Sequence, residues 1–291
     1  MGNRLKHPVW ASWLAAQLGL ELKGADVAIE HIGSLEKLAK NSLAFSKSEA
    51  PAAGQVAAAV IAPAAFFNEG TSVIASVRPR LDFARALQCL ERQAGFAGFD
   101  EFSQIHESVT FGKNVVIGNA VYIGAGTKIY NNVVIADGVR IGRDCVIKSS
   151  TVIGEEGFGF ERDEAGVPIR ILHLGSVVIG DNVELGSLNT VCRGTLDDTI
   201  IENNVKTDDH VHIAHNCVIR EGALLTACVE LSGGVEVGKN AWLGPNSSVI
   251  QKAKIGDTGF VGIGAVVTRD IEPGSTVAGN PARNLPKKTQ V

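Results

Sequence analysis

The chain of 291 residues has no apolar run long enough to cross a bilayer. Its first residues also lack the basic and then apolar pattern of a secretory signal. We therefore expect a cytoplasmic protein without a transmembrane segment. Charge of one sign is equally scarce, because 27 basic residues are balanced by 31 acidic ones and the net charge is only −4. Without a long basic run, nucleic acid is not an expected partner.

Cysteine is uncommon as well, and its pattern argues against a disulfide framework. The five cysteines are odd in number and scattered along the chain. Several fall in the repeat described next, at positions where a small apolar side chain packs well. We expect them to be reduced and buried. They are Cys89, Cys145, Cys192, Cys217 and Cys228.

What the chain does contain is a six-residue period. From Ile117 to Val267 an aliphatic residue recurs at every sixth position, apart from two interruptions and one polar exception, Thr207. The unit reads aliphatic-Gly-x-x-x-small, as in Ile117-Gly-Asn-Ala. The positions are Ile117, Ile123, Ile129, Ile135, Ile141, Ile147 and Ile153, then Ile179, Leu185 and Val191, then Ile201, Thr207, Ile213, Ile219, Leu225, Leu231, Val237, Leu243, Val249, Ile255, Val261 and Val267.

A six-residue unit is too short for a helical hairpin, but it fits a short strand followed by a sharp turn. Successive coils then pair as parallel strands about 4.8 Å apart, with the aliphatic residues stacked inside. Three strands make one coil of a triangular prism, so the twenty-two positions predict about seven coils. A set of ordinary antiparallel strands does not account for so constant a step.

The remaining sequence predicts three regions. Residues 1–104 are expected to form a small α/β module, with a helix around Trp10 to Leu20, strands from Val27 to Ile32 and from Val56 to Ile61, and a second helix from about Pro79. Residues 105–270 form the β-helix. Residues 271–291 form a short basic tail that contains Arg283, Lys287 and Lys288.

Two breaks interrupt the period, and insertions in such folds often carry the binding surface. The first lies between Ile153 and Ile179 and contains Gly157, Phe158, Gly159 and Phe160. These glycines can let the backbone approach a ligand while the phenylalanines form a wall, or the segment is a surface loop pinned by its aromatic residues. The second break contains Arg193-Gly-Thr-Leu-Asp-Asp-Thr199 and is long enough to reach a neighbouring subunit.

Three of the seven histidines lie within six residues, at His210, His212 and His215. The period points Ile213 inward, so His212 is expected to point outward, and His215 lies near a bend. An imidazole titrates near pH 6.5, which suits a general base at neutral pH. The alternative is that these are solvated surface histidines. That interpretation is less attractive for three histidines beside two aspartates than for any one of them alone.

Four blocks of sequence resemble one family in both order and spacing. They are Gly157 to Phe160, Gly175 to Glu184, Arg193-Gly194 with Leu196 to Thr199, and Ile213-Ala214-His215-Asn216. Together they resemble the UDP-3-O-acylglucosamine N-acyltransferase family of lipid A biosynthesis. The first module, with Leu43 to Phe45 and Arg78 to Arg85, is similar to that family's nucleotide-binding domain.

The resemblance implies a left-handed parallel β-helix, although ordinary crossover rules favour the right-handed form. It also implies a homotrimer with active sites between subunits. The donor is then a thioester of acyl carrier protein or coenzyme A, and no metal or permanently bound cofactor is expected. The acceptor is the amine of a nucleotide-linked amino sugar.

The resemblance also assigns residues. His215 matches the catalytic base, and Phe45 matches an aromatic that stacks on uracil. The loop of Gly157, Phe158, Gly159 and Phe160 lies near the acyl or sugar site, and a backbone N–H commonly holds the oxyanion. Asp208, His212 and Asn216, which surround the base in sequence, are expected to bind substrate.

Several departures from the family leave the substrate and the donor open. Ala253 stands where a second histidine is expected, Cys192 replaces an aspartate, and the tyrosine that partners Phe45 is absent near Pro51. A C-terminal helical extension is missing. Instead, Ala278 to Arg283 resembles the end of acetyl-CoA-dependent sugar acetyltransferases, which places Arg283 at the donor.

Two other functions remain open at this point. A γ-carbonic-anhydrase-like enzyme on the same fold binds zinc through histidines, and His173, His210 and His215 have a similar spacing. A non-catalytic nucleotide-sugar binder would explain the lost second histidine, although the retained His215 and Asn216 argue against it.

Overall fold

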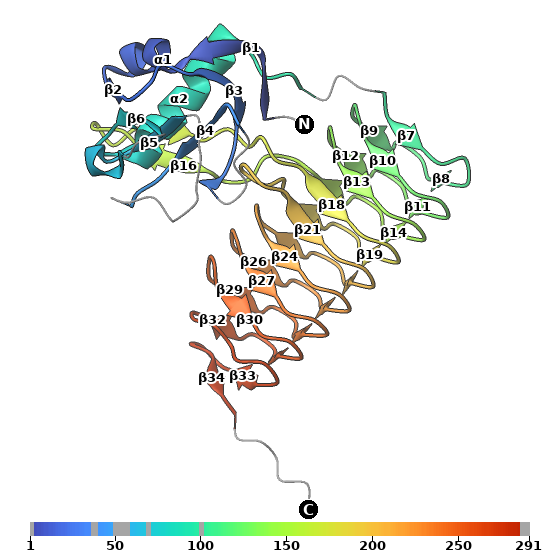
Figure 1. The fold of residues 1–291 in the computed structure, drawn as a ribbon. Helices are drawn as coiled ribbons and strands as arrows, with labels where there is room; N and C mark the ends of the chain where they lie inside the picture. Colours follow the sequence, from blue (N-terminus) through green and yellow to red (C-terminus); the bar gives the residue numbers. More distant parts are fainter. Residues whose placement is uncertain (1–2, 36–39, 49–58, 68–70, 99–101, 286–291) are drawn as a thin grey trace, which may run out of the picture. The chain divides into compact units, whose positions relative to one another are not determined.

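The computed structural model describes residues 3–35, 40–48, 59–67, 71–98 and 102–285 (Figure 1). Pro51, Val56, Lys287 and Lys288, which entered the sequence argument, lie outside these ranges. The chain divides into two compact units. Unit 1 consists of residues 1–98, 159–175 and 195–197, and unit 2 consists of residues 99–158, 176–194 and 198–291.

Unit 2 is a solenoid with three sheets, whose strands stack side by side along the prism (Figure 1). The first sheet contains β7 (Gln104–Ile105), β10 (Tyr122–Ile123), β13 (Arg140–Ile141), β18 (Val177–Ile179), β21 (Thr199–Ile201), β24 (Val218–Ile219), β27 (Glu236–Val237) and β30 (Lys254–Ile255). The second contains β8 (Thr110–Phe111), β11 (Lys128–Ile129), β14 (Val146–Ile147), β19 (Glu184–Leu185), β22 (Lys206–Thr207), β25 (Leu224–Leu225), β28 (Trp242–Leu243), β31 (Phe260–Val261), β33 (Thr276–Ala278) and β34 (Arg283–Asn284). The third contains β9 (Val116–Ile117), β12 (Val134–Ile135), β15 (Val152–Ile153), β20 (Thr190–Val191), β23 (His212–Ile213), β26 (Glu230–Leu231), β29 (Ser248–Val249) and β32 (Val266–Val267).

The register confirms the six-residue period. Each periodic residue pairs in parallel with the corresponding residue of the next coil, as Ile123 does with Ile141 and Ile213 with Leu231. The solenoid is a left-handed parallel β-helix, as in the solved structures it resembles. It has eight coils of three strands, one more than predicted, because Ile105 and Phe111 continue the period before Ile117. The set of periodic positions starts only at Ile117 because Phe111 is not aliphatic, although the predicted β-helix region of residues 105–270 includes this first coil.

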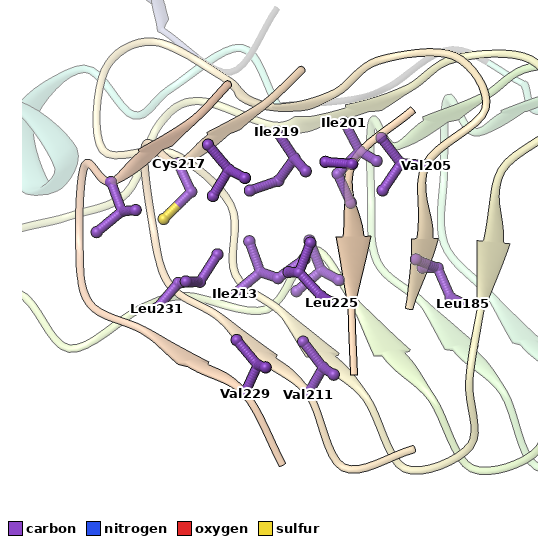
Figure 2. Close-up of a cluster of buried hydrophobic side chains, with 14 of the residues drawn as sticks. Leu185, Ile201, Val205, Val211, Ile213, Cys217, Ile219, Leu225, Val229 and Leu231 are labelled. Carbon is purple, nitrogen blue, oxygen red and sulfur yellow. The ribbon is translucent and has the colours of Figure 1, made fainter. Parts of the chain in front are cut away.

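The core receives two side chains from each six-residue unit, whereas the sequence predicted one. The second inward residue lies two positions before the periodic one, as Cys217 does before Ile219 and Val229 before Leu231 (Figure 2). This second inward position accounts for the burial of only some of the cysteines. Cys145 and Cys217 are buried there as expected, Cys89 and Cys192 are half-buried, and Cys228 is exposed, so the expectation of burial is wrong for Cys228.

The corners of the prism require a left-handed backbone at the second residue of many turns. Asparagine tolerates this conformation best after glycine, and it occupies such corners at Asn114, Asn182, Asn216 and Asn246. His210 is also left-handed, with φ of 61°. The repeat therefore determines both which residues point inward and where the chain turns.

Unit 1 is a six-stranded sheet with two helices, in the strand order β1-β3-β4-β5-β6-β2. Its elements are β1 (Arg4–Trp10), α1 (Ala11–Leu18), β2 (Glu21–Lys23), β3 (Ala28–Ile32), β4 (Ser42–Phe45), β5 (Ala59–Ala62), the 3-10 helix η2 (Ala64–Phe66), β6 (Ser72–Ala75) and α2 (Pro79–Gln93). Both predicted helices are present. The first begins one residue later than expected, because Trp10 ends a strand and is 57% exposed.

The first insertion folds as part of unit 1. It forms a hairpin of β16 (Phe160–Arg162) and β17 (Pro168–Arg170), after which Ile171 and Leu174 are buried in the core of unit 1. A single boundary at residue 104 therefore does not describe this organisation, because residues 159–175 and 195–197 return to unit 1. Among the described residues, no helix is long and apolar enough to cross a membrane.

Candidate active site

The three clustered histidines lie at successive places around one coil of unit 2. His210 is exposed at the corner before β23, and His212 lies on the outward face of β23. Ile213 points inward and is fully buried, as the period predicted. His215 is half-buried at the corner that follows β23. The structure thus brings His212 and His215 to one edge of the third sheet.

The imidazole of His215 is oriented by its neighbour in sequence. Its Nδ1 lies 3.0 Å from Oδ1 of Asn216. Because an amide oxygen only accepts hydrogen bonds, Nδ1 is the donor in this pair, and in the neutral imidazole Nε2 then holds the lone pair. The backbone N–H of Asn216 donates to Oγ1 of the buried Thr199 at 2.9 Å, which fixes this left-handed corner. The second insertion thus supplies, through Thr199, a support for the proposed base.

A glycine on the next coil lies against the same ring. A Cβ atom at Gly233 would lie 2.6 Å from Cε1 and 2.7 Å from Nε2 of His215. Such separations are far below van der Waals contact, so only glycine leaves the ring in its place. The N–H of the adjacent Gly234 donates to the carbonyl oxygen of His215 at 2.9 Å. Sequence reasoning missed Gly233, although it lies eighteen residues after His215, which is one full coil of the period.

His212 is held neutral beside this corner. Its Nδ1 lies 2.7 Å from Oγ1 of Thr190, which is its partner on the preceding coil. Burial lowers the pKa of His212, and the nearby His215 lowers it further, while Glu230 on the following coil opposes the shift. An uncharged His212 can exchange hydrogen bonds with a polar substrate without repelling a proton on His215.

A hollow of about 360 Å³ opens along the same edge, on the coils before His215. Arg193 lines it and is one coil from His215, because Val191 pairs with Ile213. Its Nε donates to the carbonyl oxygen of Gly154 at 2.6 Å and its Nη2 to that of Asp137 at 2.9 Å. Burial lowers the pKa of Arg193, and neighbouring carboxylates oppose the shift.

More acidic than basic residues line this hollow, in which Arg193 is the basic residue. The acidic residues are Asp137, Glu155 and Glu156, so the hollow carries net negative charge. Such a lining suits a ligand rich in hydroxyl groups that carries an amine. Sequence reasoning placed Arg193 in the second break but gave it no role in the site.

Comparison with known proteins connects this site to one family. The bacterial transferase hexapeptide (six repeats) family matches residues 120–155. A UDP-3-O-acylglucosamine N-acyltransferase from Campylobacter curvus is 32% identical over 299 residues, which covers 92% of this chain and 92% of that protein. One from Delftia acidovorans is 33% identical and covers 90% of this chain and 83% of that protein.

The chain belongs to the UDP-3-O-acylglucosamine N-acyltransferase family. Among solved structures, the UDP-N-acetylglucosamine O-acyltransferase of Moraxella catarrhalis is similar, with a TM-score of 0.55 and 26% identity over 63% of this chain and 72% of that one. Family membership makes the chain an N-acyltransferase. It thereby decides between acyl transfer and the two other functions considered from the sequence.

Of the other residues that the resemblance to the N-acyltransferase family assigned, Phe45, Gly159 and Phe160 lie in unit 1, and Gly157 and Phe158 lie in unit 2. Phe45 is half-buried on β4, and its ring lies 4.8 Å from that of Phe83 on α2. In the loop of the first insertion, Gly157 is buried and Phe158 is 88% exposed. Gly159 lies against the buried ring of His173, and the guanidinium of Arg170 lies over the ring of Phe160 at 4.7 Å.

Two assigned residues lie elsewhere in unit 2. Asp208 follows β22 and shares the corner of His210, where its Oδ1 accepts a hydrogen bond from the N–H of Asp209 at 2.8 Å. The structure therefore places Asp208 one corner away from His215. Arg283 is exposed on β34, and its Nη1 donates to the carbonyl oxygen of Ala282 at 3.1 Å.

The sequence comparison placed Ala253 where the N-acyltransferase family has a second histidine, but the structure does not place this residue at a substrate site. Its side chain is buried among the inward residues of the core, so this position does not face a substrate. The exposed residue at this corner is Lys252, two coils after Asn216. Within the described ranges, no group of three or more His, Cys, Asp or Glu side chains is arranged to hold a metal ion.

Proposed function

We propose that this enzyme transfers an acyl group from a thioester to the amine of a nucleotide-linked amino sugar, with His215 as the general base. One observation carries the proposal. The Asn216 oxygen fixes the proton of His215 on Nδ1, so that Nε2 is the basic nitrogen. A general base must keep this tautomer in a defined orientation. Thr199 contributes by accepting a hydrogen bond from the backbone N–H of Asn216, whose side chain orients His215.

In the proposed reaction, the sugar amine attacks the carbonyl carbon of the thioester while Nε2 of His215 takes a proton from the nitrogen. The resulting oxyanion collapses as the carbon–sulfur bond breaks. The leaving sulfur then takes the proton from the imidazolium, which returns His215 to its starting state. We assign stabilisation of the oxyanion to the backbone N–H of Gly233, because this residue lies against the reacting side of the ring.

The names of the relatives support UDP-3-O-acylglucosamine as the acceptor. The hollow beside Arg193 suits hydroxyl groups of its sugar, because the carboxylates of Asp137, Glu155 and Glu156 accept hydrogen bonds. Phe45 suits the uracil ring, since one side of its ring is occupied by Phe83 and the residue remains half-buried. We propose that His215 takes the proton from the acceptor amine and that Phe45 stacks on uracil, each role being assigned within its own unit.

The donor is a thioester of either acyl carrier protein or coenzyme A. Arg283 is exposed near the end of the solenoid and supports a phosphate-bearing donor of either kind. Such donors are made in the cytoplasm, where we expect the enzyme to act. We also expect a homotrimer with active sites between subunits, which light scattering of the purified protein would test by its mass.

The role of His215 is tested by His215→Ala. A positioned general base typically supplies 10²- to 10⁴-fold, so kcat should fall by about that factor while thermal stability is retained. His106 is exposed in the first coil and provides a matched control, since His106→Ala should leave kcat unchanged. Full activity in His215→Ala would contradict the assignment.

The substrates are tested by incubating the protein with UDP- and dTDP-amino sugars, each combined with acetyl-CoA or with hydroxyacyl carrier protein. Mass spectrometry of the products identifies the pair that is used. Turnover with acetyl-CoA alone would identify a sugar acetyltransferase. Failure with every pair would contradict the proposed function.

A further inference from the structure

The hairpin of the first insertion continues from the loop that we assign to the acceptor site. It starts at Phe160, within the loop assigned to the acceptor, and its strands pair Phe160 with Arg170 and Arg162 with Pro168. Its C-terminal end is anchored by Ile171 and Leu174, which are buried in unit 1. Because Gly159 and Phe160 belong to unit 1, the position of this half of the loop depends on how unit 1 holds the hairpin.

Unit 1 holds the hairpin through arginines on α2. Nη1 of Arg80 lies 2.7 Å from Oε2 of Glu161 on β16. Nη2 of Arg85 lies 2.5 Å from Oε2 of Glu164 in the turn, and Nη1 of Arg78 lies 3.4 Å from Oε1 of the same carboxylate. These three residues, the N-cap Arg78 together with Arg80 and Arg85 of α2, form what we call the arginine face of α2.

Backbone groups of the hairpin are held as well. The Nη2 of Arg78 donates to the carbonyl oxygen of Arg162 on β16. The side-chain amide of Gln88, about three turns after Arg78, donates to the carbonyl oxygen of Arg170 on β17 at 3.1 Å. Both strands and the turn are therefore fastened to one helix, which leaves the hairpin little freedom to slide or tilt.

The same helix supports the residue assigned to uracil. Phe83 of α2 contacts Phe45 of β4, with ring centroids 4.8 Å apart at an angle of 33°. α2 therefore contacts the nucleotide platform through Phe83 and the acceptor loop through its arginine face. The arginines are engaged by carboxylates, so their effect on the nucleotide is exerted through the hairpin.

We propose that the arginine face of α2 is a positioning element for the acceptor, which holds the loop at Phe160 at a fixed place relative to Phe45. This inference rests on the proposed function, because it takes Phe45 and the loop to be parts of the acceptor site. Breaking the ion pairs leaves the base at His215 intact but makes the acceptor bind to a less ordered loop. We therefore expect the affinity for the acceptor to fall.

The test uses the full-length protein with Glu161→Gln and Glu164→Gln combined, which removes the ion pairs and keeps the shape of the side chains. The KM for UDP-3-O-acylglucosamine should rise about fivefold, on the scale of a few partly exposed ion pairs, while kcat and the donor KM stay unchanged. The control is Asp181→Asn, which breaks the exposed Arg143–Asp181 pair of 2.6 Å on the solenoid. The control should change none of these constants.

A second readout does not depend on turnover. Hydrogen exchange should become faster at the amide of Ile171, which donates to the carbonyl oxygen of Gly159 at 3.0 Å, and in the strands of the hairpin. Charge reversal provides rescue, because Arg80→Glu with Glu161→Arg should restore slow exchange and acceptor affinity that either change alone removes.

The outcomes separate the two proposals. Faster exchange with unchanged acceptor KM would overturn the positioning role, and unchanged exchange would overturn the attachment itself. If the unmodified protein turns over no acceptor, the proposed function fails. In that case, equal dissociation constants for UDP-3-O-acylglucosamine in the Gln variant and the unmodified protein would overturn the positioning role, and a larger dissociation constant in the variant would support it.

Discussion

The corner that carries His215 depends on the lack of a side chain at Gly233. Because a Cβ atom there would lie 2.6 Å from the imidazole, Gly233→Ala must displace the ring or the strand beneath it. A displacement of about 1 Å in a reacting group costs about 10²-fold. We therefore predict that Gly233→Ala lowers kcat/KM by about 10²-fold, as measured by steady-state kinetics.

A double-mutant cycle is the control for this prediction. In a background of His215→Ala the ring is gone, so adding Gly233→Ala should cost little further activity. An equal loss in both backgrounds would show that Gly233 acts through something other than the position of His215. The backbone N–H of Gly233 is present in every variant, so the cycle isolates the contact with the ring.

His212 gives the fold a dependence on pH. Burial lowers its pKa in the folded protein, so the unfolded chain takes up this proton more readily. The sign follows: stability from this residue is present above the unfolded value of about 6.5 and is lost as pH falls through the lowered folded value. The variant His212→Gln keeps a hydrogen-bonding group for Thr190 but does not titrate.

We predict that thermal stability of the unmodified protein falls more between pH 7.5 and pH 5.5 than that of His212→Gln. Thermal unfolding monitored by circular dichroism at both pH values measures the difference. Equal losses in the two proteins would show that His212 does not contribute to acid sensitivity.

At this scale the period determined what the sequence could predict. Because the six-residue step fixes which side chains point inward, the orientations of His212 and Ile213 were predictable. The partner of His212 was not predictable, since Thr190 precedes the second break, whose irregular length separates it from His212. Asp208 illustrates the same difficulty, because closeness in sequence to His215 does not place it at the same corner.

At the scale of elements, the corners limit which residues stabilise a coil. Leu188 is 48% exposed and occupies a left-handed corner with φ of 58°. A branched side chain is strained there by about 1–2 kcal/mol, whereas asparagine adopts this conformation more easily. Leu188→Asn should therefore stabilise the protein by about 0.5–1 kcal/mol and raise Tm by about 2 °C.

Scanning calorimetry measures this change. The opposite substitution, from asparagine to leucine, can be made at Asn246. This asparagine occupies a comparable exposed corner with φ of 56°, so Asn246→Leu should lower Tm by a similar amount. If both substitutions shifted Tm in the same direction, side-chain contacts and not backbone strain would determine the stability of the corners.

The elements of the solenoid were predictable because one rule repeats in every coil, and the elements of unit 1 were less so. The period located the strands from Ile117 onward, yet it did not include β7 and β8. In unit 1, α1 and α2 showed helical spacing, whereas β1 and β6 are single strands whose burial depends on neighbours far along the chain. Nothing local distinguishes such strands from other short apolar segments.

At the scale of the whole molecule, the two units are interleaved in sequence. The chain leaves unit 1 near residue 98 and returns to it at residues 159–175 and 195–197. The sequence revealed the two breaks, because each disturbs a regular count. It did not reveal that the first break folds with unit 1, since the burial of Ile171 and Leu174 becomes evident only with the sheet and α2 in place.

This interleaving predicts that residues 1–98 do not form a stable domain by themselves. The fragment lacks Ile171 and Leu174, and each buried side chain of this kind contributes about 1.5–3 kcal/mol. Domains are stable by only about 5–15 kcal/mol, so this loss is a large part of the total. The fragment should melt at a much lower temperature than the full chain, or without a cooperative transition, in circular dichroism.

The matched control is the same fragment joined through a flexible linker to residues 159–175. This addition restores Ile171 and Leu174 together with the ion pairs of Arg80 and Arg85, so a cooperative transition should return. If residues 1–98 melted cooperatively at the same temperature with and without the hairpin, the insertion would be a surface attachment to unit 1. A difference between the two fragments would show that the first insertion completes the core of unit 1.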